Sequence, residues 1–388
     1  MNRKMQRLSD LRARVREVDA PEAFAAAALG AVLLDVRTPD EVAAGIATGA
    51  LVVDRGWLEL RVEALIPDPE TPIIVYCAAG QRSLFAAEAL DALGYADVRS
   101  MAGGLDRWKA CGLPIETPRT LDAEARARYA RHLRLPEVGE AGQLRLLDAR
   151  VLVIGAGGLG SPAALYLAAA GVGTLGVVDD DLVDRGNLQR QVLHADDRVG
   201  QRKVDSARKT LSGLNPGITV RTYAERVGPD NVAALVGDYD VVIDGTDNFA
   251  ARYVINDACV RAGLPCVHGA VHRFEGQVGV FWAAAPGGGP CYRCAFPSPP
   301  PPELAPSCAE AGVLGVLPGV IGVLQAAEAL KIVLGVGRPL VGVLLHYDAL
   351  QARFRRMQLP RDPACRACGP AADLPGLTDA AVAVCSTP

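Results

Sequence analysis

Four cysteines arranged as two close pairs offer the ligand set of a metal site. Cys291 and Cys294 form one Cys-x-x-Cys pair, and Cys365 and Cys368 form another. Four thiolates are common ligands of a tetrahedral structural Zn²⁺ and leave no coordination position open for a substrate. A redox-active Cys-x-x-Cys is the alternative, but two such pairs in one chain favour zinc. Because 70 residues separate the pairs, the fold must bring them together.

A glycine-rich loop between an apolar run and a helix-like segment predicts a nucleotide site. The motif Gly155-Ala-Gly157-Gly158-Leu-Gly160 follows the strand-like run ARVLVI. Glycines let the backbone approach a phosphate closely, and the N-terminus of the following helix favours negative charge. Asp179 ends the next strand-like run, 24 residues after Gly155, where a carboxylate can accept ribose hydroxyls. This motif does not distinguish ATP from NAD, because both contain an adenosine ribose.

Charged residues near the ends of neighbouring strands favour chemistry at phosphorus. Asn187 and Arg190 follow the acidic strand, Lys203 begins the next helix, and Asp247 and Asn248 end the fourth strand. Because the carboxyl ends of parallel strands share one edge of a sheet, these side chains should meet there. Cations and a carboxylate at one phosphate site can neutralise phosphate oxygens and hold Mg²⁺. A nicotinamide-dependent oxidoreductase is the alternative, but it would need a proton donor beside a carbonyl, and no such pair is evident.

One cysteine in the first part of the chain has the surroundings of a reactive thiol. Cys77-Ala-Ala-Gly-Gln-Arg82 follows the strand-like run PIIVY and precedes helix-like sequence. The N–H groups of such a loop, the helix N-terminus and Arg82 would stabilise a thiolate or persulfide anion. A cysteine-dependent phosphatase would have one more residue between the cysteine and the arginine. Cys111, Cys259 and Cys266 carry no motif and are predicted to be packing residues.

The elements that must position these residues alternate between apolar runs and helix-like segments. From Ala31 to Pro118, the runs AVLLDVR and PIIVYC are each followed by helix-like sequence. The stretch Gly112–Pro118 contains two prolines and is predicted to be a linker, and a charged helix is expected over Leu121–Leu133. Apolar strands then alternate with helices over Leu159–Ala170 and Lys203–Leu214. This alternation predicts an α/β fold with a mostly parallel sheet covered on both faces.

Composition limits the classes of partner and compartment. The 388 residues include 40 Lys and Arg against 44 Asp and Glu, which gives no electrostatic reason to expect nucleic acid or a membrane as the main partner. The ten cysteines include two close pairs and follow no apolar secretory leader, which indicates a reducing compartment, and the cytoplasm is expected. The apolar stretch Gly312–Gly335 contains Gln325, Glu328 and Lys331, which favours a buried or interface helix over a membrane span.

Residues from about Arg128 to Gly369 resemble the MoeB/ThiF family of ubiquitin-activating-enzyme-like adenylyltransferases. The resemblance rests on the segments RYARH, GAGGLGSP, NLQRQ, GQRKV, DGTDN, EGQVGVF, PCYRC and CRACG. It implies a Rossmann-like domain that binds ATP and Mg²⁺ and holds a structural Zn²⁺ on the four paired cysteines. The residues implied to bind the nucleotide or its metal are Gly155, Gly157, Gly158, Gly160, Asp179, Asn187, Arg190, Lys203, Asp247 and Asn248.

The same resemblance implies further catalytic residues and a homodimer. Arg190 and Asp247 would take part in catalysis, and Arg131 would reach the ATP of the other protomer. Cys308 aligns with the crossover-loop cysteine of the family, which is implied to form a thioester or a disulfide intermediate with a carrier protein. The implied reaction is attack by the terminal glycine carboxylate of a ubiquitin-like sulfur carrier ending in Gly-Gly on the α-phosphate of ATP.

The first part of the chain resembles a rhodanese. The resemblance rests on LLDVRTPDE, YCAAGQRS and GGLDRW, and it implies that Cys77 carries a persulfide while Asp35 and Arg37 are structural. A sulfur donor such as a cysteine desulfurase would load Cys77, and its sulfur would displace AMP from the adenylated carrier to leave a thiocarboxylate. The expected carrier is of the molybdopterin synthase small-subunit type. Carriers of thiamine synthesis or tRNA thiolation, a small carboxylate substrate, and a rhodanese-like docking module without chemistry remain alternatives.

These readings divide the chain into three expected segments. Residues 1–118 are expected to form a rhodanese-like sulfurtransferase domain, and residues 119–369 an adenylyltransferase domain. Residues 370–388 are expected to be a disordered tail.

Overall fold

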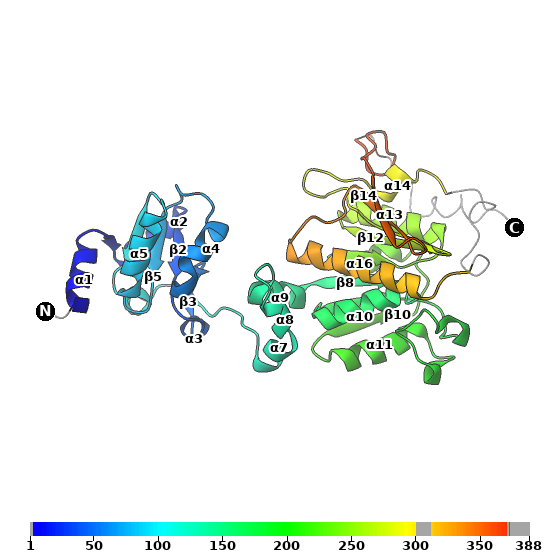
Figure 1. The fold of residues 1–388 in the computed structure, drawn as a ribbon, viewed down its shortest axis with the longest axis horizontal. Coiled ribbons are helices and arrows are strands. Elements are labelled where there is room, and N and C mark those ends of the chain that lie inside the picture. Colours follow the sequence, from blue (N-terminus) through cyan, green and yellow to red (C-terminus); the bar gives the residue numbers. More distant parts are fainter. Residues whose placement is uncertain (1–2, 300–311, 371, 373–388) are drawn as a thin grey trace. The chain divides into compact units, whose positions relative to one another are not determined.

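The chain folds into two compact units, each built around its own sheet. The computed structural model describes residues 3–299, 312–370 and 372 (Figure 1). The units are Met1–Thr120 and Leu121–Pro388. The sequence reading places its first boundary two residues earlier, after Pro118.

The first unit contains a five-stranded parallel sheet with helices on both faces. The strand order is β1-β6-β5-β2-β4. In chain order the elements are α1 (Arg3–Arg12), β1 (Arg16–Val18), α2 (Ala20–Ala28), β2 (Val32–Asp35), α3 (Pro39–Ala43), β3 (Ile46–Ala47), β4 (Leu51–Val52), η1 (Arg55–Trp57), α4 (Leu58–Leu65), β5 (Ile73–Tyr76), α5 (Arg82–Ala92), β6 (Val98–Met101), α6 (Gly104–Ala110) and β7 (Ile115–Glu116).

The central strand β5 shows why this sheet forms. All four of its residues are buried, as in strands covered on both faces, so its sequence is a continuous apolar run. Ile73 and Val75 pack in one core cluster with residues of α4 and α5. Ile74 and Tyr76 pack in another with residues of α2 and α6.

The segment predicted to be a linker is partly a strand. Ile115 and Glu116 form β7, which pairs antiparallel with β3. The indole Nε1 of Trp108 donates to the carbonyl of Pro114 at 2.8 Å. The prediction of a linker over Gly112–Pro118 was therefore wrong for these residues, because flanking prolines are compatible with a short strand at a sheet edge.

The second unit contains an eight-stranded mixed sheet. The elements are α7 (Ala123–Arg128), α8 (Ala130–Leu133), α9 (Gly139–Asp148), β8 (Arg150–Ile154), α10 (Gly160–Ala170), β9 (Thr174–Val178), η2 (Arg185–Asn187), η3 (Asp196–Arg198), α11 (Lys203–Leu214), β10 (Thr219–Tyr223), α12 (Val232–Gly237), β11 (Val241–Asp244), α13 (Phe249–Ala262), β12 (Cys266–His272), β13 (Glu275–Phe281), α14 (Tyr292–Ala295), α16 (Val316–Leu334), β14 (Val343–Asp348) and β15 (Arg353–Gln358). Their order in the sheet is β10-β9-β8-β11-β12-β13-β14-β15.

The strand order creates a switch point between β8 and β11. Strands β10, β9, β8, β11 and β12 are parallel, and β13, β14 and β15 continue the sheet antiparallel. From β8 the chain builds outward through β9 and β10, then returns to add β11 on the other side of β8. In open α/β sheets, ligands bind outside the carboxyl ends of the strands at such a point.

One helix predicted from the sequence is interrupted in the structure. The charged segment predicted as one helix over Leu121–Leu133 is two short helices, α7 and α8, separated at Tyr129. Tyr129 is buried, and its hydroxyl accepts a hydrogen bond from Asn215 at 2.9 Å, so packing of this side chain interrupts the helix.

Helix α16 is long and apolar enough to span a membrane, and it packs within the second unit. It is the one such helix among the described residues. Leu317, Ile321 and Ala326 lie in the main core cluster of this unit. The amide of Gln325 donates to the carbonyls of Asp244 and Val267 at 2.8 and 3.0 Å. These contacts make α16 a core helix of this unit.

Candidate functional site

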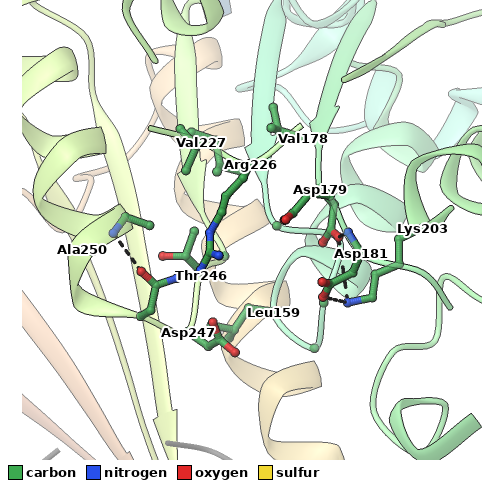
Figure 2. A pocket seen from close by; sticks show the side chains of 18 of the residues that line it. Leu159, Val178, Asp179, Asp181, Lys203, Arg226, Val227, Thr246, Asp247 and Ala250 are labelled. Atoms are coloured by element: carbon green, nitrogen blue, oxygen red, sulfur yellow. Dashed lines mark hydrogen bonds and ion pairs between the residues drawn. The ribbon is translucent and has the colours of Figure 1, made fainter. Parts of the chain in front are cut away.

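A cavity of about 580 Å³ lies at the switch point of the eight-stranded sheet (Figure 2). Loops that follow β8, β9, β10 and β11 form its walls, together with residues before and at the start of α16. The sequence-predicted residues that line it are Gly155, Gly157, Gly158, Asp179, Arg190, Lys203, Asp247 and Asn248. The fold thus brings residues from motifs that are distant in the sequence to one site.

The glycines of the loop after β8 are required for different structural reasons. Gly155 has φ of 94°, and a Cβ there would lie 2.8 Å from the carbonyl oxygen of Gly245. A Cβ on Gly160 would lie 1.7 Å from the carbonyl oxygen of Gly155, so Gly160 permits the close packing of helix on loop. Gly157 has no such crowding and faces the cavity. The loop therefore leaves open backbone at Gly157, where a phosphate can approach.

Asp179 lies directly after β9 with its carboxylate held by backbone amides. Oδ2 accepts from Ala156 N at 2.8 Å and Oδ1 accepts from Asp181 N at 2.9 Å. Burial raises the pKa of Asp179, and the Lys203 ammonium, 3.9 Å from Oδ1, partly opposes that rise. Lys203 also donates to Asp181 Oδ2 at 2.7 Å. The acid and the lysine thus form one charged cluster on the wall of the cavity (Figure 2).

The remaining predicted nucleotide residues divide into those that face the cavity and those that support others. The guanidinium of Arg190 is held by Asn187, whose Oδ1 lies 2.8 Å from Nη2. Asn187 itself does not line the cavity. Asp247 lies in the cavity wall, and the Oδ1 of Asn248 accepts from Ala251 N at 2.9 Å as the N-cap of α13. Asn248 therefore begins the helix that follows Asp247.

A buried acid–histidine pair under the cavity was not foreseen from the sequence. Asp244 Oδ1 accepts from the backbone N and the hydroxyl of Thr246, at 3.1 and 2.6 Å. Its Oδ2 lies 2.9 Å from His268 Nδ1. Burial lowers the pKa of His268, so the neutral ring donates from Nδ1. Burial would raise the pKa of Asp244, but the bond from His268 contributes to an overall lowering. The pair fixes the turn that carries Asp247.

The four paired cysteines come together in the geometry of a metal site. Their Sγ atoms all lie within 4.8 Å of one another. The separations are 3.9 Å for Cys291 and Cys294, 3.6 Å for Cys291 and Cys365, and 3.4 Å for Cys294 and Cys368. A tetrahedron with Zn–S bonds of about 2.3 Å has sulfur–sulfur edges of about 3.8 Å. The residues present therefore fit Zn²⁺ with all four positions taken by protein.

Cys77 lies in the first unit at the carboxyl end of β5. The residue is 1% exposed, and its Sγ lies 3.8 Å from the hydroxyl of Ser83. Its carbonyl accepts from Leu105 N at 2.8 Å. A Cβ on Gly104 would lie 2.2 Å from that oxygen, so glycine is required for α6 to approach the loop.

The arginine that follows Cys77 is paired with an acid that the sequence reading did not identify. Arg82 forms two hydrogen bonds with Glu41, at 2.7 and 2.6 Å. This pairing lowers the pKa of Glu41 to about 2. Asp35 and Arg37, expected to be structural, form a buried ion pair at 2.7 Å.

One predicted catalytic residue of the second unit, Arg131, is not part of the cavity of its own chain. Arg131 lies exposed on α8 and is not among the residues that line the cavity. Cys308 lies outside the described residues. Cys259 and Cys266 are buried in one core cluster, and Cys111 packs against another.

Comparison with known proteins identifies two matching family models. The model of the ThiF family matches residues 129–367. The model of the rhodanese-like domain matches residues 20–111.

Curated relatives are about 50% identical to this chain over the aligned residues. A probable adenylyltransferase/sulfurtransferase MoeZ of Mycobacterium tuberculosis is 52% identical over 250 residues, which cover 64% of each chain. A sulfur carrier protein adenylyltransferase of Thermus thermophilus is 53% identical over 244 residues, covering 62% of this chain and 90% of the relative. The adenylyltransferase and sulfurtransferase MOCS3 of Sus scrofa is 52% identical over 257 residues, covering 66% and 56%. The matched region thus spans 64% of the Mycobacterium relative and about half of the pig relative.

Solved structures share the fold. Escherichia coli MccB, crystallised with ATP, matches with a TM-score of 0.54 and 24% identity over 64% of this chain and 76% of its own. PaaA matches with a TM-score of 0.55 and 23% identity over 71% of this chain and 83% of its own.

Proposed function

This chain belongs to the ThiF family, and we propose that it uses ATP to adenylate the C-terminal glycine of a ubiquitin-like sulfur carrier protein. We further propose that its rhodanese-like domain supplies sulfur to the activated carboxylate. The observation that carries the proposal is the cavity in which Gly157, Asp179, Lys203 and Asp247 meet. Relatives at about 50% identity are named adenylyltransferases and sulfurtransferases, and one is named for a sulfur carrier protein.

The adenylation step is a transfer at phosphorus. A carboxylate oxygen of the carrier forms a bond to the α-phosphorus of ATP, the bond from that phosphorus to the bridging oxygen breaks, and pyrophosphate leaves. Arg190 and Lys203 would neutralise charge on the phosphates, and the backbone N–H at Gly157 would donate to a phosphate oxygen. Asp247 would hold Mg²⁺, which when bound supplies further positive charge at the leaving group. The site contributes chiefly position and charge.

The sulfur step would begin from a persulfide on Cys77. Its terminal sulfur attacks the acyl carbon, AMP leaves with the electron pair of the broken C–O bond, and an acyl disulfide remains. A second thiol, for which Cys308 is proposed, then attacks the Cys77 sulfur, so that a Cys77–Cys308 disulfide forms, the acyl S–S bond breaks and the thiocarboxylate leaves. A reducing thiol from solution must convert that disulfide back to two cysteines before the next turnover. A sulfur donor such as a cysteine desulfurase would load Cys77, and a molybdopterin-type carrier remains our first expectation.

Zinc, a homodimer and a cytoplasmic location are part of the same proposal. The sulfur separations in the cysteine cluster support Zn²⁺. An apolar hollow that includes Val323, Leu330 and the 57%-exposed Tyr166 supports a second copy as partner, since large exposed aromatic side chains are common at interfaces. A homodimer would also give Arg131 a nucleotide to reach.

The test is ATP–pyrophosphate exchange by the purified chain, with and without a Gly-Gly-ended carrier. We expect exchange that requires the carrier and falls to background in Asp247→Ala. Asp240→Ala is a matched control, because this exposed carboxylate pairs with Arg150 outside the cavity. Absence of exchange with any of several carriers would refute the proposal. Binding of NAD in place of ATP would favour the oxidoreductase alternative.

A further inference from the structure

The cavity has two chemically different halves. One half carries the charged groups Asp179, Arg190 and Lys203. The other is apolar and is lined by residues of β8, β9, α13 and the loop after β10: Ile154, Val178, Val227, Ala251 and Val254. Ile154, Val178 and Val254 are at most 3% exposed and belong to one core cluster, so this half is a preformed apolar wall.

The two halves of the cavity match the two ends of a nucleotide. This match rests on the proposed function, in which the cavity binds ATP. In a nucleoside triphosphate, the base and the phosphates lie at opposite ends of the ribose. With its phosphates near Lys203 and Arg190 and its ribose near Asp179, the nucleotide must place its base against the apolar wall. Apolar walls suit the faces of a purine, whose specificity then depends on groups around it.

The loop that closes the apolar half is built on one asparagine. Asn231 Nδ2 donates to Glu225 Oε2 at 2.7 Å and to the carbonyl of Arg226 at 3.0 Å. Its Oδ1 accepts from Gly228 N at 2.8 Å. Two of these three hydrogen bonds reach the backbone of the loop, at the carbonyl of Arg226 and the N–H of Gly228, and hold it in place.

The side chain of Arg226 is not tied down in the same way. It extends from the loop into the cavity, toward the side on which Thr246 and Asp247 lie (Figure 2). The other two cations that line the cavity are both held, Arg190 by Asn187 and Lys203 by Asp181. Across residues 3–299, 312–370 and 372, the guanidinium of Arg226 has no hydrogen bond or ion pair. The backbone of Arg226 is thus held in place, while its guanidinium is available to bind a ligand.

We propose that Arg226 is a base-binding residue, which folds over the apolar half of the cavity and stacks its guanidinium on the adenine of bound ATP. The planar guanidinium is weakly hydrated and stacks well on aromatic faces. Val227, the next residue, also lines the cavity, and the base would lie between the aliphatic wall and the guanidinium of Arg226. An ammonium group cannot reproduce the planar contact.

The test compares ligands that have or lack phosphates. Displacement of labelled ATP from the full-length chain would give the affinities of ATP, AMP and adenosine for the wild type, Arg226→Ala and Arg226→Lys. We expect the alanine variant to weaken all three ligands by a similar factor, about 5- to 30-fold, because stacking is lost whatever the phosphate count. Lysine should not restore the affinity. Arg221→Ala is the matched control, since Arg221 lies on β10, pairs with Asp238 and does not line the cavity.

Each other outcome overturns the proposal. Weaker ATP binding with unchanged adenosine binding and rescue by lysine would make Arg226 a phosphate contact. If Arg226→Ala leaves all three affinities unchanged, Arg226 is a solvated surface cation and does not bind the base. The proposed function would still stand, provided that the wild type binds ATP and catalyses carrier-dependent exchange. Failure of the wild type to bind ATP would instead overturn the proposed function itself.

Discussion

The guanidinium of Arg293 and the carboxylate of Asp257 form a buried two-point ion pair that joins the cysteine cluster to helix α13. Nε donates to Oδ1 at 2.8 Å and Nη2 to Oδ2 at 2.7 Å, and the two side chains are 5% and 2% exposed. The adjacent amide, Tyr292 N, donates to Asn256 Oδ1 at 2.7 Å. Since Asp247 directly precedes the N-cap of α13, the metal-type cluster and the nucleotide cavity share one helix.

Removal of the acid from this pair should destabilise the second unit strongly. Asp257→Ala leaves the Arg293 guanidinium buried without its partner, at an expected cost of about 3–5 kcal/mol in the free energy of unfolding. Calorimetry of the full-length chain should show a lower transition temperature for the unit that contains α13. Asp196→Ala is the matched control, because Asp196 also makes a two-point pair, with Arg185, but both side chains are more than 60% exposed. The control should cost less than about 1 kcal/mol, and equal effects of the two variants would contradict the argument.

The cysteine cluster should contain zinc in the purified protein. We expect about one Zn²⁺ per chain by elemental analysis and its loss in Cys365→Ser, because three thiolates no longer complete the tetrahedron. Loss of the metal should also increase hydrogen exchange in α13, through the contacts of Tyr292 and Arg293 with that helix. Cys111→Ser, in the first unit, should keep the metal. Equal zinc content in both variants would show that the metal binds elsewhere.

Local motifs were sufficient to predict the glycine loop and the acidic residue of the cavity wall. Strand, glycine loop and helix are contiguous around Gly157, so their geometry follows from a short segment, and the spacing to Asp179 is typical of a βαβ unit. Asn248 shows that a motif can predict that a residue lies at the site without predicting its structural role. An asparagine directly before a helix is a common N-cap, and its carbonyl oxygen indeed accepts from Ala251 N, a supporting role that the motif did not predict.

Contacts between distant segments could not be predicted from the sequence. Asp244 and His268 are 24 residues apart and pair only because β11 and β12 are neighbours in the sheet. Glu41 and Arg82 are likewise brought together by the fold. Arg226 belongs to no motif, and only the path of the loop after β10 brings it to the cavity. Each of these contacts depends on the register and order of strands, which no local pattern specifies.

The pair of Glu41 and Arg82 should make the stability of the first unit depend on pH. The pKa of Glu41 is lowered from 4.5 to about 2, so the folded state binds fewer protons than the unfolded state between these values. Its stabilisation is therefore fully present above pH 4.5 and is lost as the pH falls toward 2. We expect Glu41→Gln to lower the unfolding temperature at pH 7, with a difference from wild type that shrinks toward zero near pH 2.

A surface carboxylate that does not pair with Arg82 serves as the control for the pH series. Glu63 is exposed on α4, and Glu63→Gln should leave the unfolding temperature close to that of wild type at pH 7. A constant difference between Glu41→Gln and wild type over the whole range would show that the glutamate acts through packing and not through its charge.

Replacement of Cys77 should separate the two chemical steps. Every residue assigned to adenylation lies in the unit Leu121–Pro388, whereas Cys77 lies in Met1–Thr120. We therefore expect Cys77→Ala to keep carrier-dependent ATP–pyrophosphate exchange within about twofold of wild type and to lose thiocarboxylate formation, read by the mass of the carrier. The buried position tolerates the change, since alanine is smaller than cysteine and removes no hydrogen bond stronger than the 3.8 Å contact with Ser83. Cys111→Ala, at the other described cysteine of this unit, should keep both activities. Thiocarboxylate formation by Cys77→Ala at the wild-type rate would instead mean that the rhodanese-like domain docks partners and that sulfur reaches the acyl-adenylate by another thiol.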